Sequence, residues 1–282
     1  MLASVIFCLS GSLTAKAGPQ DYEALRALVG NAMKVIHSRT THEFVARFQG
    51  VDISFNLYNS RFNPAAVYKH NCVATPSDEV VDCDLGLADE LISEFKLAEM
   101  SGSQLDKETL RYYQEYIIEW ILAHEIGHVV LRHGRSDFAD DIRGFAVFDA
   151  AAQQRELSAD SFAVDLVAVP DSTDFSAFGV VLTISNSLMR KSVCPETYPK
   201  VCSRMPAGVG LIYDYANGSP IKVGLSGSHP AYTARFLRLL YLIGKDVDAP
   251  GLKEEASGAI ELLQVETNPG TWEPIKNALL KK

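Results

Sequence analysis

The sequence lacks any uninterrupted apolar stretch of about 20 residues, the length that a helix needs to cross a bilayer. The most apolar later stretch, Phe175 to Leu188, contains several Ser, Thr and Asn residues, so we expect a buried or amphipathic helix there. Internal repeats of about 34 residues are also absent, which argues against a tetratricopeptide array. These absences predict one globular domain with no transmembrane segment in the mature chain.

A concentrated basic surface is lacking as well. The 282 residues carry 26 Lys and Arg against 35 Asp and Glu, a formal net charge of −9, and no Lys/Arg cluster stands out. Binding to the phosphates of DNA or RNA needs such a cluster, so we expect no nucleic-acid partner. Hydrophobic residues make up 47% of the chain, which indicates a substantial core. The oligomeric state leaves no mark in the sequence.

The first residues form an apolar run, Met1 to Leu9, that lacks basic residues and is followed by the A-x-A pattern Ala15-Lys16-Ala17. This order is typical of a secretory signal peptide. We therefore interpret residues 1–17 as a signal peptide, residues 18–282 as a single domain, and the protein as periplasmic or secreted. The alternative is a short N-terminal helix buried in the fold.

Cleavage after Ala17 would remove Cys8 and leave an even number of cysteines, Cys72, Cys83, Cys194 and Cys202. An even count suits an oxidising compartment, and pairing within each local pair needs the least chain reorganisation. Zinc binding is a rival use, although neither pair has C-x-x-C spacing. Four reduced, buried thiols are the other alternative.

His124, Glu125 and His128 form the pattern H-E-x-x-H inside a run of helix formers, Tyr112 to Val130, that contains no proline. Residues four apart project from one face of a helix, so the two imidazoles can share one tetrahedral zinc ion. Glu125 lies beside them, where its carboxylate can remove a proton from a water in the open fourth position. The pattern predicts a zinc site with a built-in general base.

The expected ends of this helix are marked by Asp106, a suitable N-cap, and Gly134, a suitable C′ residue. His133 precedes that glycine. It follows His124 by nine residues, about half a turn away around the helix, so we expect it at the helix end or against a ligand rather than on the ion.

A second helical stretch, Ala150 to Val167, contains Glu156 and Asp160, again four apart. Glu156 is a candidate third ligand of the ion. Asp160 can then accept the distal N–H of a ligand histidine.

At this point the chain resembles the M48 family of zinc metallopeptidases. That family has H-E-x-x-H on one helix, matched at 124–128, and E-x-x-A-D on a later one, matched at 156–160. Its H-P feature followed by an arginine is matched by His229-Pro230 and Arg235. The resemblance runs from about Asn63 to Leu240.

The resemblance implies an α+β fold of the gluzincin type, mainly helical, with a small antiparallel sheet beside the active-site helix. It also implies one Zn²⁺ per chain, with His124, His128 and Glu156 as ligands and Glu125 as the general base. His229 and Arg235 would then lie near the substrate. For His229 the alternative is a purely structural turn before Pro230.

Two extended segments upstream, Asn63–Tyr68 and Glu79–Leu87, are similar to the strands that precede the active-site helix in that family. A peptide bound along such an edge would be held mainly through its backbone. A plain structural hairpin is the alternative.

Periodicity predicts the remaining elements. We expect helices at Asp21–Ser38, Leu252–Leu263 and Thr271–Leu280. Two strands, Thr41–Gln49 and Val51–Tyr58, should be joined at Gly50, and Gly210–Val223 should form a hairpin or flap before His229.

Together these patterns predict an exported zinc endopeptidase that acts on protein or peptide substrates. The alternatives are a zinc-containing, chaperone-like or latent binding protein with little proteolysis, and a zinc-dependent hydrolase of non-protein amides. Turnover of an unfolded protein and a comparison of peptide with amide substrates would separate them.

Overall fold

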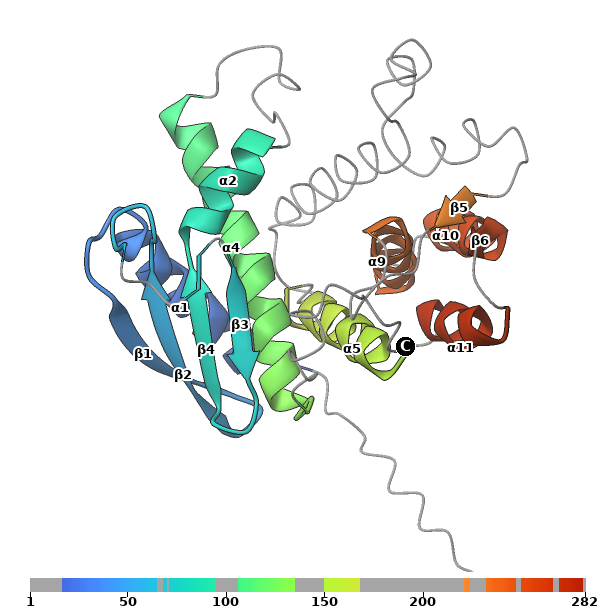
Figure 1. Cartoon of the computed structure of the whole chain (residues 1–282), viewed down its shortest axis with the longest axis horizontal. Coiled ribbons are helices and arrows are strands. Elements are labelled where there is room, and N and C mark those ends of the chain that lie inside the picture. The colour runs from blue at the N-terminus through green and yellow to red at the C-terminus, as the bar shows by residue number, and fades with distance from the viewer. Residues whose placement is uncertain are drawn as a thin grey trace, which may run out of the picture.

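A computed structural model describes nine parts of the chain: residues 17–64, 68–69, 71–94, 106–134, 150–167, 221–223, 232–246, 250–265 and 269–280. They form an α+β fold in which helices lie on one side of a four-stranded sheet (Figure 1). The α+β class predicted from the sequence is therefore confirmed. No helix in this described portion is long and apolar enough to cross a membrane.

The N-terminal part is a helix followed by a hairpin. Helix α1 (Pro19–Val35) begins with proline in its first turn and buries one face, and strands β1 (His42–Phe48) and β2 (Val51–Tyr58) pair antiparallel. Gln49 and Gly50 join the strands with φ of 45° and 85°, the left-handed values of a tight hairpin turn. The expected helix and the expected strand pair at Gly50 are both present.

The sheet is mixed, and the predicted antiparallel sheet is wrong in this respect. The strand order is β1-β2-β4-β3, where β3 is Cys72–Thr75 and β4 is Val80–Asp84. Strand β4 pairs antiparallel with β3 but parallel with β2. The parallel pairing arises because the hairpin partner β3 takes the outer edge, so β4 inserts beside β2 and runs in its direction.

The hairpin partner of β4 is β3, and the predicted extended segment Asn63–Tyr68 is described only at Asn63, Pro64 and Tyr68. Asn63 and Pro64 follow a turn in which the Phe62 N–H donates to the Asn59 carbonyl at 3.0 Å. The true hairpin turn starts at Thr75, whose carbonyl accepts from Asp78 N–H at 3.1 Å. Pro76 at the second position suits such a turn, and that signal was overlooked.

One face of the sheet is buried. Ile53, Phe55 and Leu57 alternate inward along β2 and are fully buried, while Asp52 and Ser54 point outward to solvent. Helices α1 and α4 (Lys107–Val130) pack on the inward face and share one apolar core with it (Figure 1). The sheet thereby fixes the position of the helix that carries H-E-x-x-H.

A short helix, α2 (Gly86–Glu94), follows β4 directly and packs against α4. The predicted extended segment Glu79–Leu87 is therefore wrong at Gly86 and Leu87, which belong to this helix. Asp84 explains the change of direction, because its Oδ1 accepts the N–H groups of Gly86 at 3.0 Å and Ser60 at 2.9 Å. This buried carboxylate fixes the chain where the strand ends.

Cys72 and Cys83 lie directly opposite each other on β3 and β4 and form a disulfide, with their Cα atoms 4.0 Å apart. The predicted local pairing is confirmed for this pair. Cys194 and Cys202 lie outside the described residues, as do residues 1–16, Phe175–Leu188 and His229.

Helix α4 begins as predicted, with Asp106 accepting the N–H of Thr109 at 2.7 Å. It ends two residues earlier than predicted. Arg132, and not Gly134, has the left-handed conformation, with φ of 52°. The N–H of Arg132 donates to Val129 O and the N–H of His133 to His128 O, both at 3.0 Å, which is a Schellman C-terminus.

The C-terminal part consists of helices and one short strand pair. Helix α5 (Ala150–Val167) matches its prediction and packs against α4, α9 and α11, and β5 (Ile221–Val223) pairs parallel with β6 (Leu263–Val265). The first arm of the predicted hairpin or flap Gly210–Val223 lies outside the described residues, and its last three residues, β5, pair with a distant segment. The remaining helices are α9 (Tyr232–Asp246), α10 (Pro250–Leu262) and α11 (Pro269–Leu279).

Candidate metal centre

Helices α4 and α5 approach closely where the chain has small residues. A Cβ atom on Gly127 would lie 3.2 Å from Ala159 Cα, Ala159 O and Phe162 Cβ. Ala159 is fully buried. The second residue after the glutamate of H-E-x-x-H is thus glycine because the α5 backbone occupies the space of a side chain. This approach brings the ligand residues of the two helices together.

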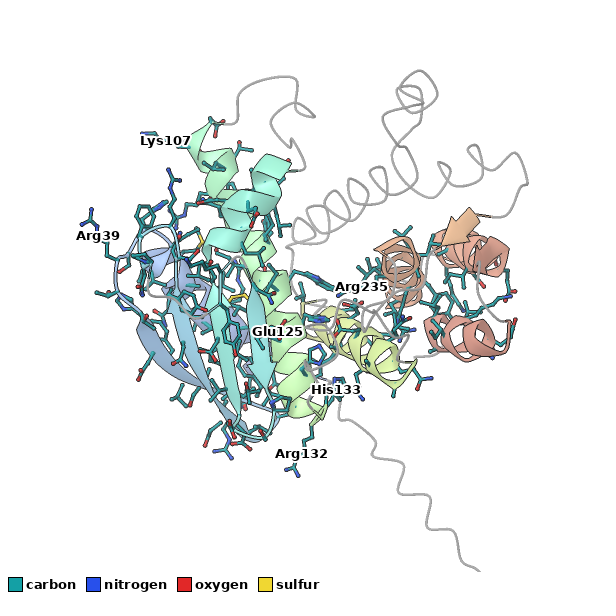
Figure 2. All side chains as sticks on the ribbon, in the orientation of Figure 1. Arg39, Lys107, Glu125, Arg132, His133 and Arg235 are labelled. Carbon is teal, nitrogen blue, oxygen red and sulfur yellow. A yellow bond between two sulfur atoms is a disulfide. The ribbon has the colours of Figure 1, made fainter. Side chains whose placement is uncertain are left out.

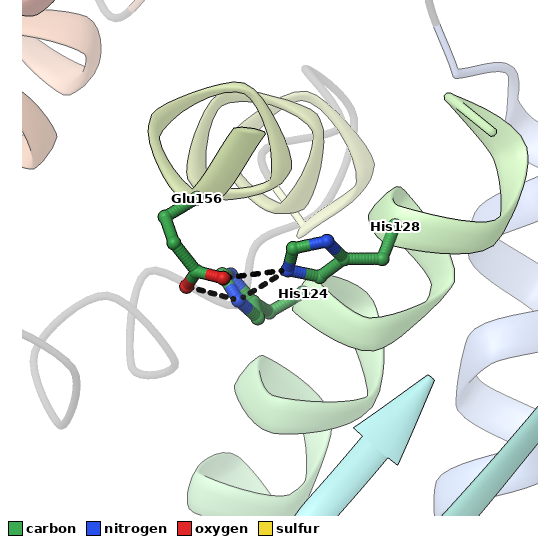
Figure 3. Close-up of side chains that lie close together, drawn as sticks. All are labelled: His124, His128 and Glu156. Carbon is green, nitrogen blue, oxygen red and sulfur yellow. Dashed lines mark hydrogen bonds and ion pairs between the residues drawn. The ribbon is translucent and has the colours of Figure 1, made fainter. Parts of the chain in front are cut away.

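Three side chains converge beside this contact (Figure 3). His124 Nε2 lies 3.3 Å from Glu156 Oε2, and His128 Nε2 lies 3.3 Å from Glu156 Oε1. The two Nε2 atoms are 3.1 Å apart. All three side chains are largely shielded from solvent, with side-chain exposures of 10%, 14% and 13%.

The arrangement fits a divalent cation. Three vertices of a tetrahedron with bonds of about 2.0–2.1 Å lie about 3.3 Å apart, close to the three separations found here. With a cation bound, neutral imidazoles protonated on Nδ1 would direct two Nε2 lone pairs and a carboxylate at that ion. Two imidazoles and one carboxylate also form a donor set that zinc accepts. His124, His128 and Glu156 therefore form a group that can hold a metal ion.

A buried carboxylate supports the first ligand. Asp160 Oδ1 lies 3.0 Å from His124 Nδ1, and Asp160 is fully buried. Burial alone would lower the pKa of His124, but the carboxylates of Asp160 and Glu156 outweigh it and raise that pKa to about 10. Binding of a cation to Nε2 must therefore displace a firmly held proton.

Arg235 on α9 holds Asp160 from the other side. Its Nε and Nη2 donate to Asp160 Oδ2 and Oδ1 at 2.8 and 2.7 Å, and its Nη1 lies 4.0 Å from Glu156 Oε2. Although burial opposes ionisation, the arginine and His124 keep the pKa of the Asp160 carboxyl well below its usual range. The pKa of Glu156 is also low, because the two histidines and Arg235 outweigh its burial.

Glu125 lies on α4 beside the sheet edge (Figure 2). Burial raises the pKa of its carboxyl, while His124 and His128 act in the opposite direction. A hydrogen bond from the backbone of Ala74 on β3 also favours the ionised form. Burial outweighs these influences, so the pKa of Glu125 lies above its ordinary value, which suits a general base.

His133 contacts a ligand rather than the metal position. Its Nδ1 lies 3.0 Å from the Nδ1 of His128, and the two rings meet edge to face with centroids 5.0 Å apart. Burial and the neighbouring His128 and Arg155 lower the pKa of His133 to about 4. The ring is therefore neutral at neutral pH.

With this geometry established, comparison with known proteins gives one match. Residues 106–217 match the family model Peptidase U49. The match covers less than half of the chain and includes α4 and α5, which carry the three candidate ligands. No curated protein and no solved structure matches the chain.

The match to Peptidase U49, a distinct peptidase family, overturns the resemblance to M48. The motifs misled for a physical reason. H-E-x-x-H on one helix and E-x-x-A-D on a second describe a ligand geometry, and the same geometry serves the same chemistry in different families. The third motif, at residues 228–235, lies outside the matched region. The gluzincin-type fold stays a prediction, while the grouping of the three ligand residues does not depend on the family.

One residue that positions the site was missed in the sequence. Arg238 is buried on α9 and donates from Nε to Leu157 O at 3.2 Å and from Nη2 to Ser161 Oγ, so it grips α5 beside Asp160. Its Nη1 donates to the carbonyls of Ala278 and Leu279 at the end of α11. The sequence indicates a buried arginine here, because Arg238 stands inside the apolar run 236–240 and a buried arginine needs partners.

Proposed function

We propose that this protein is a zinc-dependent endopeptidase that hydrolyses peptide bonds in exported or misfolded proteins. The observation that carries the proposal is the convergence of His124, His128 and Glu156 between two helices, with Glu125 on the same helix as the histidines. The match of residues 106–217 to a peptidase family supports the same reaction class.

His124, His128 and Glu156 would hold the ion, and a bound divalent cation supplies Lewis-acid chemistry, acidifying water and polarising a carbonyl. Glu125 takes the proton of the attacking water and later delivers it to the leaving nitrogen. Its neighbours permit both steps, because burial favours the protonated form while the histidines and Ala74 favour the ionised form.

A substrate chain has a natural place beside Glu125. Strand β3 lies at the edge of the sheet and packs against α4. An extended peptide added to that edge would be held mainly by backbone hydrogen bonds, which gives broad sequence tolerance. The disulfide between Cys72 and Cys83 fixes this strand to its neighbour.

Two further residues complete the proposal. Arg235 acts through Asp160, because its Nε and Nη2 bind that carboxylate. Its Nη1 lies 4.0 Å from Glu156 Oε2. We assign to His229 the hydrogen bond that stabilises the oxyanion of the tetrahedral intermediate, because an imidazole N–H can donate to it and His229 precedes α9, the helix that carries Arg235. Normal turnover by a His229→Ala variant would exclude that role.

The same proposal includes export. The apolar run and A-x-A pattern in residues 1–17, together with the Cys72–Cys83 disulfide, favour a periplasmic or secreted protein. N-terminal sequencing of exported protein tests this directly. A mature chain that does not begin at Gly18 would refute the assigned cleavage site.

The deciding experiment compares wild type with Glu125→Gln in zinc content and in casein proteolysis. Both proteins should bind one zinc per chain, and the variant should lose turnover by about 100- to 10,000-fold, because the proton acceptor is gone. Zinc binding without proteolysis by the wild type would favour a latent or chaperone-like binding protein. Cleavage of amides but not peptides would favour a non-protein substrate, and equal proteolysis by both proteins would refute the role of Glu125.

A further inference from the structure

The two histidine ligands are supported in different ways, and one support has no role in the reaction described above. His124 Nδ1 faces the carboxylate of Asp160 at 3.0 Å. His128 Nδ1 faces another imidazole, that of His133, also at 3.0 Å. We infer that His133 is a positioning residue that fixes the tautomer and the ring angle of His128 for metal binding. The inference rests on the proposed metal site.

The direction of this hydrogen bond follows from the geometry. His128 Nε2 is the atom that faces the cluster, 3.3 Å from Glu156 Oε1 and 3.1 Å from His124 Nε2. A neutral imidazole carries one proton, so a free lone pair on Nε2 requires the proton on Nδ1. That N–H donates to His133 Nδ1, whose own proton then resides on its Nε2.

The backbone is built to bring His133 to this place. Had α4 continued, His133 would lie about 140° around the axis from His128, out of reach. Instead Arg132 adopts φ of 52°, a left-handed conformation that is unfavourable for a residue other than glycine. The reversal lets the N–H of His133 donate to the carbonyl of His128 while its ring meets the ring of His128. Arg132 thus ends helix α4 and at the same time brings His133 against His128.

The chemical consequence is an unequal pair of ligands. A carboxylate behind His124 pulls on its Nδ1 proton and makes its Nε2 a stronger donor. A neutral imidazole behind His128 orients the ring without adding negative charge. The site therefore carries one buried supporting carboxylate among these contacts, and that carboxylate is already paired with Arg235.

The test measures zinc affinity by competition with a chromophoric chelator, in a Glu125→Gln background in which turnover is removed. His133→Ala should weaken zinc binding by about 10- to 100-fold, the usual range for loss of a residue that supports a ligand. His133→Asn, whose side-chain oxygen can accept from His128 Nδ1, should restore most of the loss. Arg132→Gly, which keeps the left-handed turn and His133, should bind zinc like the parent.

A second readout does not depend on mutation. In the metal-free protein, ¹⁵N-detected NMR of the imidazole should find the His128 proton on Nδ1. A proton on Nε2, unchanged affinity in His133→Ala, or an Asn variant as weak as the Ala variant would each overturn the inference. If the parent protein binds no zinc, the metal site itself fails. If it binds zinc without cleaving casein, only the proposed reaction fails.

Discussion

At the scale of single residues, the site is a chain of contacts that starts outside the three candidate ligands. Arg235 binds Asp160 through two hydrogen bonds, Asp160 faces His124, and His124 points at Glu156. Each member holds the next in one orientation. The position of the metal is therefore decided by residues that would never touch it.

Replacing Asp160 by asparagine should weaken zinc affinity by about 10- to 100-fold, because the amide cannot supply the charge that holds both His124 and Arg235. Zinc competition against a chelator measures the effect. Ser158→Ala is the matched control, since Ser158 is an exposed residue on the same helix whose hydroxyl donates to the Gln154 carbonyl of its own helix. Zinc affinity equal to that of the control would reduce Asp160 to a structural residue.

At the scale of helices and strands, local patterns were readable and pairings between distant segments were not. The i, i+4 spacing of His124 and His128 and the cap at Asp106 depend only on neighbouring residues, and both are found as predicted. The parallel alignment of β4 with β2 depends on a hairpin strand inserted at the edge, which no short window of sequence encodes. The predicted helix end at Gly134 is wrong because the left-handed residue is Arg132, and local propensity favours glycine over arginine at such a position.

The crossing of α4 and α5 gives the element-scale prediction. Gly127→Ala should force the two helices apart by a few tenths of an ångström, since the added methyl would lie 3.2 Å from the α5 backbone. We expect a loss of about 1–3 kcal/mol in the free energy of unfolding and a weaker zinc site. Urea denaturation and zinc competition measure the two effects.

Gly30→Ala on α1 is the control for this substitution. A Cβ at Gly30 has no atom within 4 Å, so the free energy of unfolding should rise by about 0.5–1 kcal/mol through helix propensity. A Gly127→Ala protein that gains stability like Gly30→Ala, with unchanged zinc affinity, would mean that the close approach does not set the site.

At the scale of the whole molecule, the candidate ligands lie where α4, which packs on the sheet, meets α5, which packs on the later helices. Helix α4 belongs to the core shared with the sheet, whereas α5 also packs on α9 and α11. Arg238 connects these later helices, because it donates to α5 and to the last carbonyls of α11. The C-terminal helix thus supports the ligand helix without contributing a ligand.

A chain ending at Asn268 should therefore lose zinc affinity as well as stability. Removing α11 leaves the buried guanidinium of Arg238 without its acceptors on Ala278 and Leu279, a cost of at least about 1–3 kcal/mol. Urea unfolding and zinc titration measure both losses. A chain lacking only Lys281 and Lys282 is the control and should match the full protein. Normal zinc binding by the shorter chain would show that α5 is held without α11.

The hydrogen bonds of Arg238 also bear on when activity can begin. The ribosome makes α4 and α5 first, and the acceptors on α11 follow Arg238 by 40 and 41 residues. An unfinished chain has all three ligands but not the helix that steadies α5. The proposed peptidase would meet unfolded chain, including its own C-terminal residues, during its own synthesis. With the proposed peptidase activity, cleavage would therefore begin only after α11 has been made and has bound Arg238.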